Sequence, residues 1–224
     1  MRGNVLTPKV RRSSTDSTLR DREPKENSLF LAVVLTYLTV LAVLSGLEAA
    51  GITVRLPLVF SLISGELTLV IPTVLYVLIR RSNLRGLSVR WRSPIAVIPL
   101  LILMAYCMMP LISVINLVSM MLAGENAAAS MLGTLQQLPL WVSLLCVAVL
   151  PGVVEEFIFR GLLYSEYRRR RTWGAILASG VLFGLMHMNL NQFCYAFVIG
   201  VLFCLVYEAT GSLLAPMLMH VVFN

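Results

Sequence analysis

Charged residues are scarce in this 224-residue chain. Asp, Glu, Lys and Arg together make up 13% of it, whereas they account for about 25% of an average soluble domain. Aspartate is almost missing, because Asp16 and Asp21, both near the N-terminus, are the only two. A pair of catalytic aspartates inside a membrane is therefore excluded. With 58% hydrophobic residues, the composition predicts a multi-pass integral membrane protein and excludes an ordinary soluble domain.

Several sequence motifs of hydrolases are also missing. The chain has no HExxH, which excludes that zinc-hydrolase arrangement, and no GxSxG, which would present a nucleophilic serine. No cysteine is adjacent to a histidine, and no CxxC pair occurs. The cysteines lie in apolar stretches and indicate neither a disulfide framework nor a metal site. They are Cys107, Cys146, Cys194 and Cys204.

The first 27 residues differ from the rest of the chain. They contain seven Lys/Arg, four Asp/Glu and almost no large apolar residue, a pattern typical of a disordered tail. A signal peptide would have a short basic region and a cleavable apolar run. The first apolar segment begins only at Ser28 and is long enough to cross a membrane, so we interpret it as an uncleaved signal anchor. We therefore expect a tail over 1–27 and a transmembrane domain over 28–224.

Apolar runs of spanning length predict about seven transmembrane helices joined by short loops. They lie at roughly 28–47, 56–79, 94–122, 138–167, 172–188, 192–208 and 211–224. The fourth run, of about 30 residues, is too long for a straight span, and we expect it to tilt and to kink at Pro151. The expected fold class is all-α, a polytopic transmembrane helix bundle.

Basic residues fall on one side of this predicted bundle. Of the 18 Lys/Arg, seven lie in the tail, five lie in the loop 80–93, and five more are Arg160 and Arg168–Arg171, whereas only Arg55 falls on the other side. Because cytoplasmic loops carry an excess of Lys and Arg, that side is predicted to be cytoplasmic. The sequence thus predicts a cell-membrane protein with a cytoplasmic N-terminus, and its net charge of +7 indicates membrane orientation and no nucleic-acid partner.

Ionisable residues inside the predicted spans are functional candidates, because a charged group in hydrocarbon costs at least about 2.5–3.5 kcal/mol on insertion scales. They are Glu66, Glu155, Glu156, Arg160, His187 and His220. Counting about 1.5 Å per residue from the ends of the spans, Glu155 and both histidines can meet at one depth, with Asn224 close by. Such convergence predicts a site. Glu66 has no evident partner, and we expect it to line a cavity without a catalytic role.

The two adjacent glutamates are distinguished by helical spacing. Glu156 and Arg160 are at i,i+4, so they share a helix face and can form an ion pair, which would allow Arg160 to be buried. Glu155 points about 100° away and lacks that partner. Because such pairs near a helix end are often structural, we expect a supporting role for this one.

The two histidines each have a companion one turn away. His220 and Asn224 are at i,i+4 and give one helix face two polar side chains. Phe183 and His187 have the same spacing, and we expect the phenyl ring to stack beneath the imidazole. A glutamate in a poorly solvated pocket is a usable general base for water, and imidazole and amide N–H groups can stabilise an oxyanion. Together these groups can hydrolyse a peptide bond without a covalent nucleophile or a metal.

Three motifs in order on successive predicted helices carry a resemblance to a known family. EEFIFR (Glu155–Arg160), FGLMH (Phe183–His187) and HVVFN (His220–Asn224) resemble the EExxxR, FxxxH and HxxxN motifs of the CAAX protease and bacteriocin-processing (CPBP, or Abi) family. The resemblance covers residues 150–224. It implies an intramembrane, metal-independent glutamate endopeptidase. Prenyl-protein members of this family remove the last three residues of a CAAX tail, and bacterial members are linked to peptide pheromones, bacteriocin immunity and signalling.

The resemblance also implies roles for individual residues. The implied catalytic residues are Glu155 and His187, which activate water, and His220 and Asn224, which stabilise the oxyanion. The implied supporting residues are Glu156, Arg160 and Phe183. No cofactor is implied. The implied partners are the lipid bilayer and a hydrophobic or prenylated peptide or membrane-protein substrate.

Three other interpretations stay open from the sequence. Glu, two His and Asn are also able to ligate zinc. Buried Glu and His are able to relay protons or bind a cation in a transporter. A non-catalytic membrane scaffold or bacteriocin-immunity-type protein would keep the same fold. The last run has about 14 residues, about 21 Å of helix against a hydrocarbon core of about 30 Å, so we expect the sequence to be truncated at the C-terminus.

Overall fold

The described part of the chain is helical. The structure, a computed structural model, describes residues 25–52, 57–80, 89–91, 93–124, 129, 132–133, 135–168 and 171–224. These residues form helices, turns and short connections and no strand, which confirms the all-α prediction. Residues 1–24 of the predicted tail lie outside the described residues, and the first helix begins at Lys25, three residues before the predicted start of the membrane domain.

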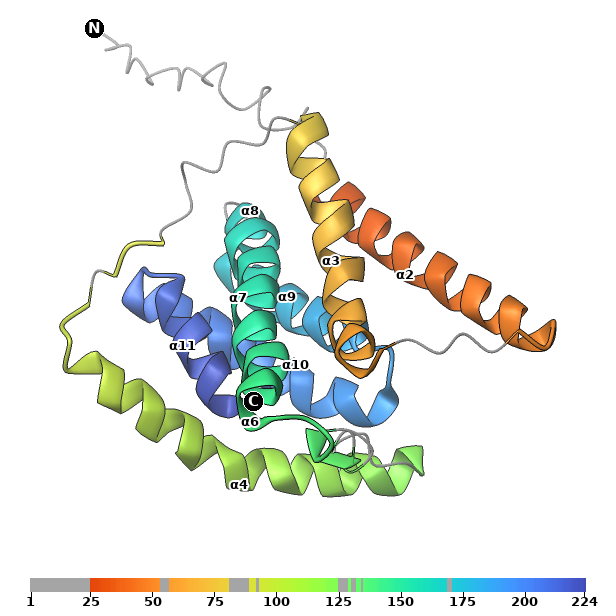
Figure 1. Cartoon of the computed structure of the whole chain (residues 1–224). Helices are drawn as coiled ribbons and strands as arrows, with labels where there is room; N and C mark the ends of the chain where they lie inside the picture. Colours follow the sequence, from red (N-terminus) through yellow and green to blue (C-terminus); the bar gives the residue numbers. More distant parts are fainter. Residues whose placement is uncertain are drawn as a thin grey trace, which may run out of the picture.

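The helices follow the predicted apolar runs (Figure 1). The first half of the chain forms α2 (Lys25–Ala49), α3 (Leu58–Arg80) and α4 (Val97–Ala123). One long helical segment then combines α6 (Leu140–Ser143), η2 (Leu144–Val149), α7 (Leu150–Glu156), η3 (Phe157–Tyr164) and α8 (Ser165–Tyr167). The last helices are α9 (Thr172–Met186), α10 (Leu190–Thr210) and α11 (Leu214–Phe223).

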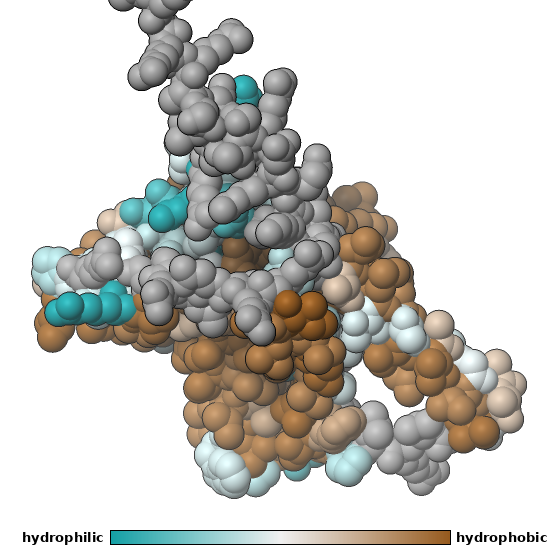
Figure 2. Space-filling view, turned by 90° about the horizontal axis from the view of Figure 1, so that it is seen from above, coloured by the Kyte–Doolittle hydropathy of each residue, from teal (hydrophilic) through white to brown (hydrophobic). Residues whose placement is uncertain are grey.

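Apolar side chains cover much of the coloured surface on the face that Figure 2 shows. Four of the described helices are long and apolar enough to cross a membrane, over Leu62–Ile79, Val97–Ala123, Leu140–Tyr167 and Leu190–Thr210. The apolar helices Leu31–Leu47, Thr172–Met186 and Leu214–Phe223 are shorter. The chain is therefore a multi-pass membrane protein, and the number of seven spans stays a prediction.

The long segment 140–167 departs from regular α-helix on both sides of α7. The π-helical segment η2 ends just before Pro151, and the π-helical segment η3 begins directly after Glu156. Proline has no N–H for the i→i−4 hydrogen bond, so the regular pattern is interrupted at the position where the sequence predicts a kink. Short π-helical segments occur frequently at functional sites, and these two flank both glutamates of the EExxxR motif.

Glycines allow α9 and α10 to pack closely. A Cβ added to Gly200 of α10 would lie 2.9 Å from the Cα of Gly180 in α9, and one added to Gly184 would lie 2.9 Å from the ring of Phe193. The two backbones therefore meet where larger side chains would hold them apart, as small residues commonly allow between transmembrane helices. This packing fixes the end of α9, from which His187 extends.

Buried amide and hydroxyl groups join α4 to the start of α10. Nδ2 of Asn191, which is fully buried, donates to Oδ1 of Asn116 and to Oγ of Ser119, both at 2.9 Å. Oγ of Ser119 in turn donates to the backbone oxygen of Asn191 at 3.1 Å. Polar side chains often hydrogen-bond between helices in this way within membranes. The hydrogen bonds hold the first turn of α10, and with it the short connection that follows His187.

Candidate active site

Glu156, Arg160 and His220 form one buried network. The side chains of Glu156 and Arg160 are 0% exposed, and Nη1 of Arg160 donates to Oε1 of Glu156 at 2.9 Å. Nδ1 of His220 lies 2.9 Å from the same oxygen. The ion pair that the i,i+4 spacing predicts is thus formed within one helical segment. The histidine is a third member, contributed by α11, which helical spacing does not reveal.

The guanidinium of Arg160 has partners on two further helices. Nη2 donates to the backbone oxygen of Gly200 at 2.8 Å. Cζ lies 4.5 Å from the ring centroid of Phe183 and 5.2 Å from that of Phe203, within the range of cation–π attraction. A buried charge needs such compensation, and Arg160 consequently ties η3 to both α9 and α10.

His187 is held by the carbonyl one turn before it. Its backbone N–H donates to Gly184 at 3.2 Å, which leaves the Phe183 oxygen free to accept from Nδ1 of the His187 ring at 2.9 Å. Because a carbonyl oxygen only accepts, Nδ1 carries the proton, and in the neutral ring Nε2 is an acceptor. The hydrogen bond therefore fixes both the position and the tautomer of the imidazole.

Phe183 contacts His187 through an edge and does not stack beneath it. The ring centroids are 5.2 Å apart and the ring planes meet at 72°, so the predicted contact is present but the predicted stacking is wrong. The Phe183 ring is also edge-on to Phe159, at 5.1 Å. Edge-to-face contacts suit the quadrupole of an aromatic ring. They also leave the face of Phe183 to Arg160.

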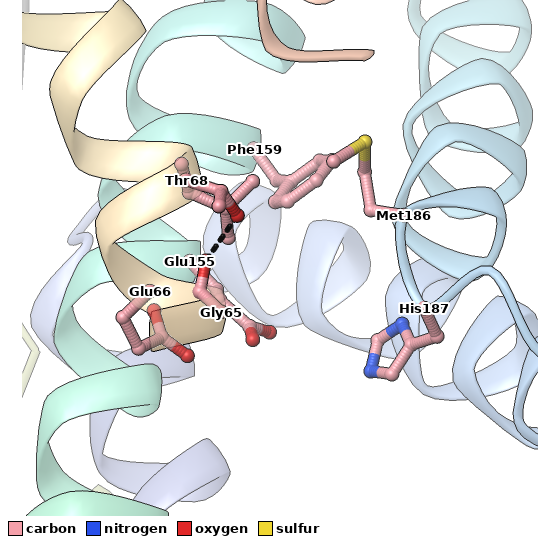
Figure 3. A pocket seen from close by; sticks show the side chains of 8 residues that line it. Gly65, Glu66, Thr68, Glu155, Phe159, Met186 and His187 are labelled. Carbon is pink, nitrogen blue, oxygen red and sulfur yellow. Dashed lines mark hydrogen bonds between the residues drawn. The ribbon is translucent and has the colours of Figure 1, made fainter. Parts of the chain in front are cut away.

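A pocket of about 100 Å³ brings polar side chains from three helical segments together (Figure 3). Glu66 comes from α3, Glu155 from α7 and His187 from the end of α9. The other lining residues include Thr68, Phe159 and Met186. A pocket of this size and polarity is large enough to hold water.

Glu155 lies near both histidines. It shares the pocket with His187, and its Oε2 is 4.0 Å from Nε2 of His220. Among the described residues, none donates a hydrogen bond to this buried oxygen. Buried carboxylate oxygens ordinarily have hydrogen-bond partners, so the Glu155 oxygen is available as an acceptor for a hydrogen-bond donor that enters the pocket.

Asn224 is not among the residues that line the pocket. Its Nδ2 donates to the backbone oxygen of Val147 at 3.0 Å. Pro151, four residues after Val147, has no N–H with which to make the usual helical hydrogen bond. The amide of Asn224 therefore satisfies a carbonyl that the proline leaves without its usual donor, and it links α11 to η2.

The structure separates the predicted site residues into groups. Glu155 and His187 line the pocket; Glu156, Arg160, Phe183 and His220 form the network beside it; Asn224 is outside both. The geometry does not test the catalytic and supporting roles, which stay predictions.

Motif reasoning leaves out Glu66, which is 8% exposed. Its charge within an apolar run was the available signal, but its neighbour Glu155 belongs to another helix and cannot be found by helical spacing.

The described part of the chain contains no preformed group of side chains that could bind a metal ion. No three His, Cys, Asp or Glu residues there are grouped so that they could hold a metal ion. Two carboxylates and one imidazole do line the pocket. The zinc interpretation therefore has to be tested by measuring whether activity depends on a metal ion.

Comparison with known proteins concerns the C-terminal part of the chain. Residues 137–224 match the family model described as Type II CAAX prenyl endopeptidase Rce1-like. The matched region contains Glu155, His187 and His220 and does not include α2, α3 or α4.

One curated relative extends this likeness. The chain is 28% identical over 101 residues to "Putative membrane peptidase YdiL" of Bacillus subtilis (strain 168), an alignment that covers 45% of this chain and 40% of the relative. The chain thus spans less than half the length of that protein. No solved structure matches the chain.

Proposed function

We propose that the chain is a membrane-embedded endopeptidase whose general base is a glutamate, because residues 137–224 match the family model described as Type II CAAX prenyl endopeptidase Rce1-like and part of the chain is similar to a putative membrane peptidase. Three features support this function. A carboxylate and an imidazole line one pocket of an apolar helix bundle. The imidazole is held by the Phe183 carbonyl. A buried ion pair lies next to the pocket glutamate in the sequence.

The pairing of Glu155 with His187 in the pocket is the observation that carries the proposal. Glu155 has an oxygen without a donor among the described residues, and His187 has Nε2 as its remaining acceptor. A water molecule donates two hydrogen bonds, and these two acceptors can take both. A water held in this way has its oxygen lone pair free for attack, which is the requirement for general-base catalysis.

In the proposed reaction, one O–H bond of water breaks and its proton goes to the Glu155 carboxylate. The water oxygen forms a bond to the carbonyl carbon of the substrate peptide, which gives a tetrahedral intermediate. When the C–N bond breaks, Glu155 returns the proton to the leaving amine nitrogen. The carboxylate is thereby regenerated, and neither a metal nor a covalent enzyme intermediate takes part.

We assign the oxyanion of the intermediate to His220 and Asn224. His220 directs Nδ1 at Glu156, so Nε2 can donate only when the ring is an imidazolium. Asn224 uses one amide hydrogen for Val147 and has a second for the oxyanion. Preorganised donors of this kind stabilise charge that develops in the transition state.

The proposed substrate is a membrane-tethered peptide, either hydrophobic or prenylated. The pocket lies among helices whose outer surface is apolar (Figure 2), so a peptide anchored in the bilayer would approach it at high local concentration. The name of the matched family model refers to prenyl endopeptidases. A CAAX-type tail is therefore the first substrate to test.

The proposed function is tested with protein purified in lipid nanodiscs and quenched fluorescent peptides. The set contains a farnesylated CAAX peptide, the same peptide with the prenylated cysteine replaced by serine, and a library of hydrophobic peptides. We expect the wild type to cleave at least one of them and Glu155→Gln to lose about 10²–10⁴-fold or more in kcat, with an unchanged unfolding temperature. The control is Glu208→Gln, which removes a partly exposed ion pair with Arg168 and should retain activity.

Two results would contradict the proposal. A well-folded Glu155→Gln protein that cleaves at the wild-type rate would remove this glutamate from the reaction. If the wild type cleaves no peptide in the set, a non-catalytic scaffold or immunity-type protein becomes the better explanation.

A further inference from the structure

Glu66 of α3 has a buried carboxyl group, and the proposed reaction gives this group no role. It is 8% exposed and lies within the apolar span Leu62–Ile79. Its Oε2 receives no hydrogen bond from the residues that the structure describes. An ionised carboxylate without a partner is strongly unfavourable at such a position, so the groups around Glu66 decide what role it can have.

The neighbour of Glu66 is the proposed general base. Figure 3 shows Glu66 and Glu155 beside each other in the pocket, with His187 across from them. The lining of the pocket, as far as the structure describes it, includes no Lys or Arg. Arg160 is bound to Glu156 instead.

Two carboxyl groups so placed cannot both be ionised. In a poorly solvated site the repulsion between two adjacent negative charges keeps one proton on the pair. The protonated group then donates an O–H···O⁻ hydrogen bond to the other, which is a charge-assisted bond and therefore a strong one. Such a bond removes the unfavourable charge from Glu66 and also orients its partner.

We propose that Glu66 is a positioning residue of the active site and shares one proton with Glu155. The O–H group of Glu66 donates to one oxygen of the Glu155 carboxylate and leaves the other oxygen for water. This role rests on the proposed function, in which Glu155 is the base. Because α3 lies outside the region that matches the family model, the first helices supply a polar group that the C-terminal motifs do not contain.

Few charged groups lie around Glu66 among the residues that the structure describes. From α7 the group that faces it is Glu155, and from α9 it is His187 across the pocket. His220 of α11 reaches Glu155 at 4.0 Å. Of the described elements, α2 and η2 also pack on α3. Residues 31–47 of α2 contain no carboxyl, imidazole or basic side chain, and η2 contains the thiol of Cys146 but no charged group.

The pH dependence of cleavage tests the proposal, because the direction in which the acid limb of the pH profile moves distinguishes the two protonation states of the pair. If Glu66 donates a hydrogen bond, Glu66→Leu removes the stabilisation of the Glu155 carboxylate, and the acid limb of kcat/KM moves up by about one pH unit. If both groups were ionised, removal of the negative charge would move the acid limb down. Glu66→Gln keeps an N–H donor and should move the limb less than Glu66→Leu.

The same variants separate positioning from stability. We expect Glu66→Leu to lower kcat about 10–100-fold with little change in KM, because a misplaced base loses its alignment with water, and Glu66→Gln to recover part of the loss. The matched control is Thr73→Val on the same helix, since Thr73 is buried and does not line the pocket. An acid limb that moves down, or a Glu66→Leu protein with the wild-type profile, overturns the proposal.

Infrared spectroscopy provides a readout that needs no substrate. A protonated carboxyl group has a C=O stretch separate from the bands of carboxylates, and we expect this band near neutral pH in the wild type. It should disappear in Glu66→Gln and persist in Glu208→Gln. A band of full strength in Glu66→Gln, or no band in the wild type, overturns the shared proton. Because failure of the proposed function is measured by turnover in Glu155→Gln, the two failures are distinguishable.

Discussion

Nδ1 of His220 lies 2.9 Å from Oε1 of Glu156, the same oxygen that accepts from Arg160. One buried carboxylate therefore holds together a side chain of α11 and a side chain of η3. Glu155, the preceding residue, instead faces the pocket that contains His187. Adjacent residues on a helix point about 100° apart, and this angle gives the two glutamates different surroundings.

Loss of the Glu156–Arg160 pair should lower stability. Glu156→Ala leaves a buried guanidinium without its carboxylate, and Arg160→Ala leaves a buried carboxylate without its guanidinium, each at a cost of about 3–5 kcal/mol. We expect lower folded yield and a lower unfolding temperature for both variants, measured in detergent by size exclusion and thermal unfolding.

The matched control for this pair is a double variant. Glu156→Leu combined with Arg160→Met removes both charges and should be more stable than either single change, because neither member of the ion pair is then left buried without the other. Single variants with wild-type unfolding temperatures would show that the pair is not needed for the fold.

His187 and Glu155 should act on the same water. We expect His187→Ala to reduce kcat/KM with little loss of folded yield, because the ring contributes a hydrogen bond at the pocket. The Glu155→Gln and His187→Ala double variant should be little worse than the worse single variant, since residues that act as a unit are not additive. Losses that multiply would indicate that the two side chains act in separate steps.

Cleavage should not depend on a metal ion. The proposed reaction uses Glu155 as its base and His220 with Asn224 as oxyanion donors, so activity should persist in chelator and the purified protein should contain less than stoichiometric zinc. Mass spectrometry of the metal content and activity after dialysis provide the measurement. Activity that is lost in chelator and restored by zinc would make the pocket residues metal ligands.

Gly200 should tolerate no side chain. Its added Cβ would lie 2.9 Å from the Cα of Gly180 and 3.3 Å from Cβ of Phe183, so Gly200→Ala forces α9 and α10 apart, at a cost of about 1–3 kcal/mol. Activity should also fall, because His187 extends from α9. The control is Gly46→Ala, which meets nothing within 4 Å. Equal unfolding temperatures for the two variants would refute the close packing.

Membrane topology can be read by labelling single cysteines in a cysteine-free background. Because basic residues favour the cytoplasm, cysteines at Ser13, Ser82 and Thr172 should react only from the cytoplasmic side. One at Asn126 should react only from outside. Reaction of positions 82 and 126 from the same side would disprove both the seven-span prediction and the predicted orientation.

Local spacing within a helix accounts for what the sequence predicts well. The 3.6-residue period places Glu156 beside Arg160 whatever the rest of the chain does, and the pair is formed. The same period brings Phe183 to His187, but the ring angle of 72° depends on Arg160 and Phe159, which come from another segment. Contacts along one helix are thus predictable, whereas side-chain orientation that depends on a third partner is not.

Span length is predictable for each run but not for the assembly. The predicted apolar runs agree with the observed helices to within a few residues. However, α9 and α11 are shorter than the other apolar helices. Whether a short helix crosses the bilayer depends on tilt, local thickness and packing against its neighbours. The sequence supplies hydrophobicity, and these other terms belong to the folded bundle.

The sequence by itself determined that this is a helical membrane protein with ionisable residues inside its apolar runs and with three motifs that resemble those of a known protease family. The tertiary structure decided that His220 binds Glu156, that Asn224 binds Val147, and that Glu66 meets Glu155 in the pocket. The physical reason lies in the range of the forces. Helix periodicity fixes neighbours three or four residues apart, whereas contacts between helices depend on how ridges, grooves and small residues fit in three dimensions.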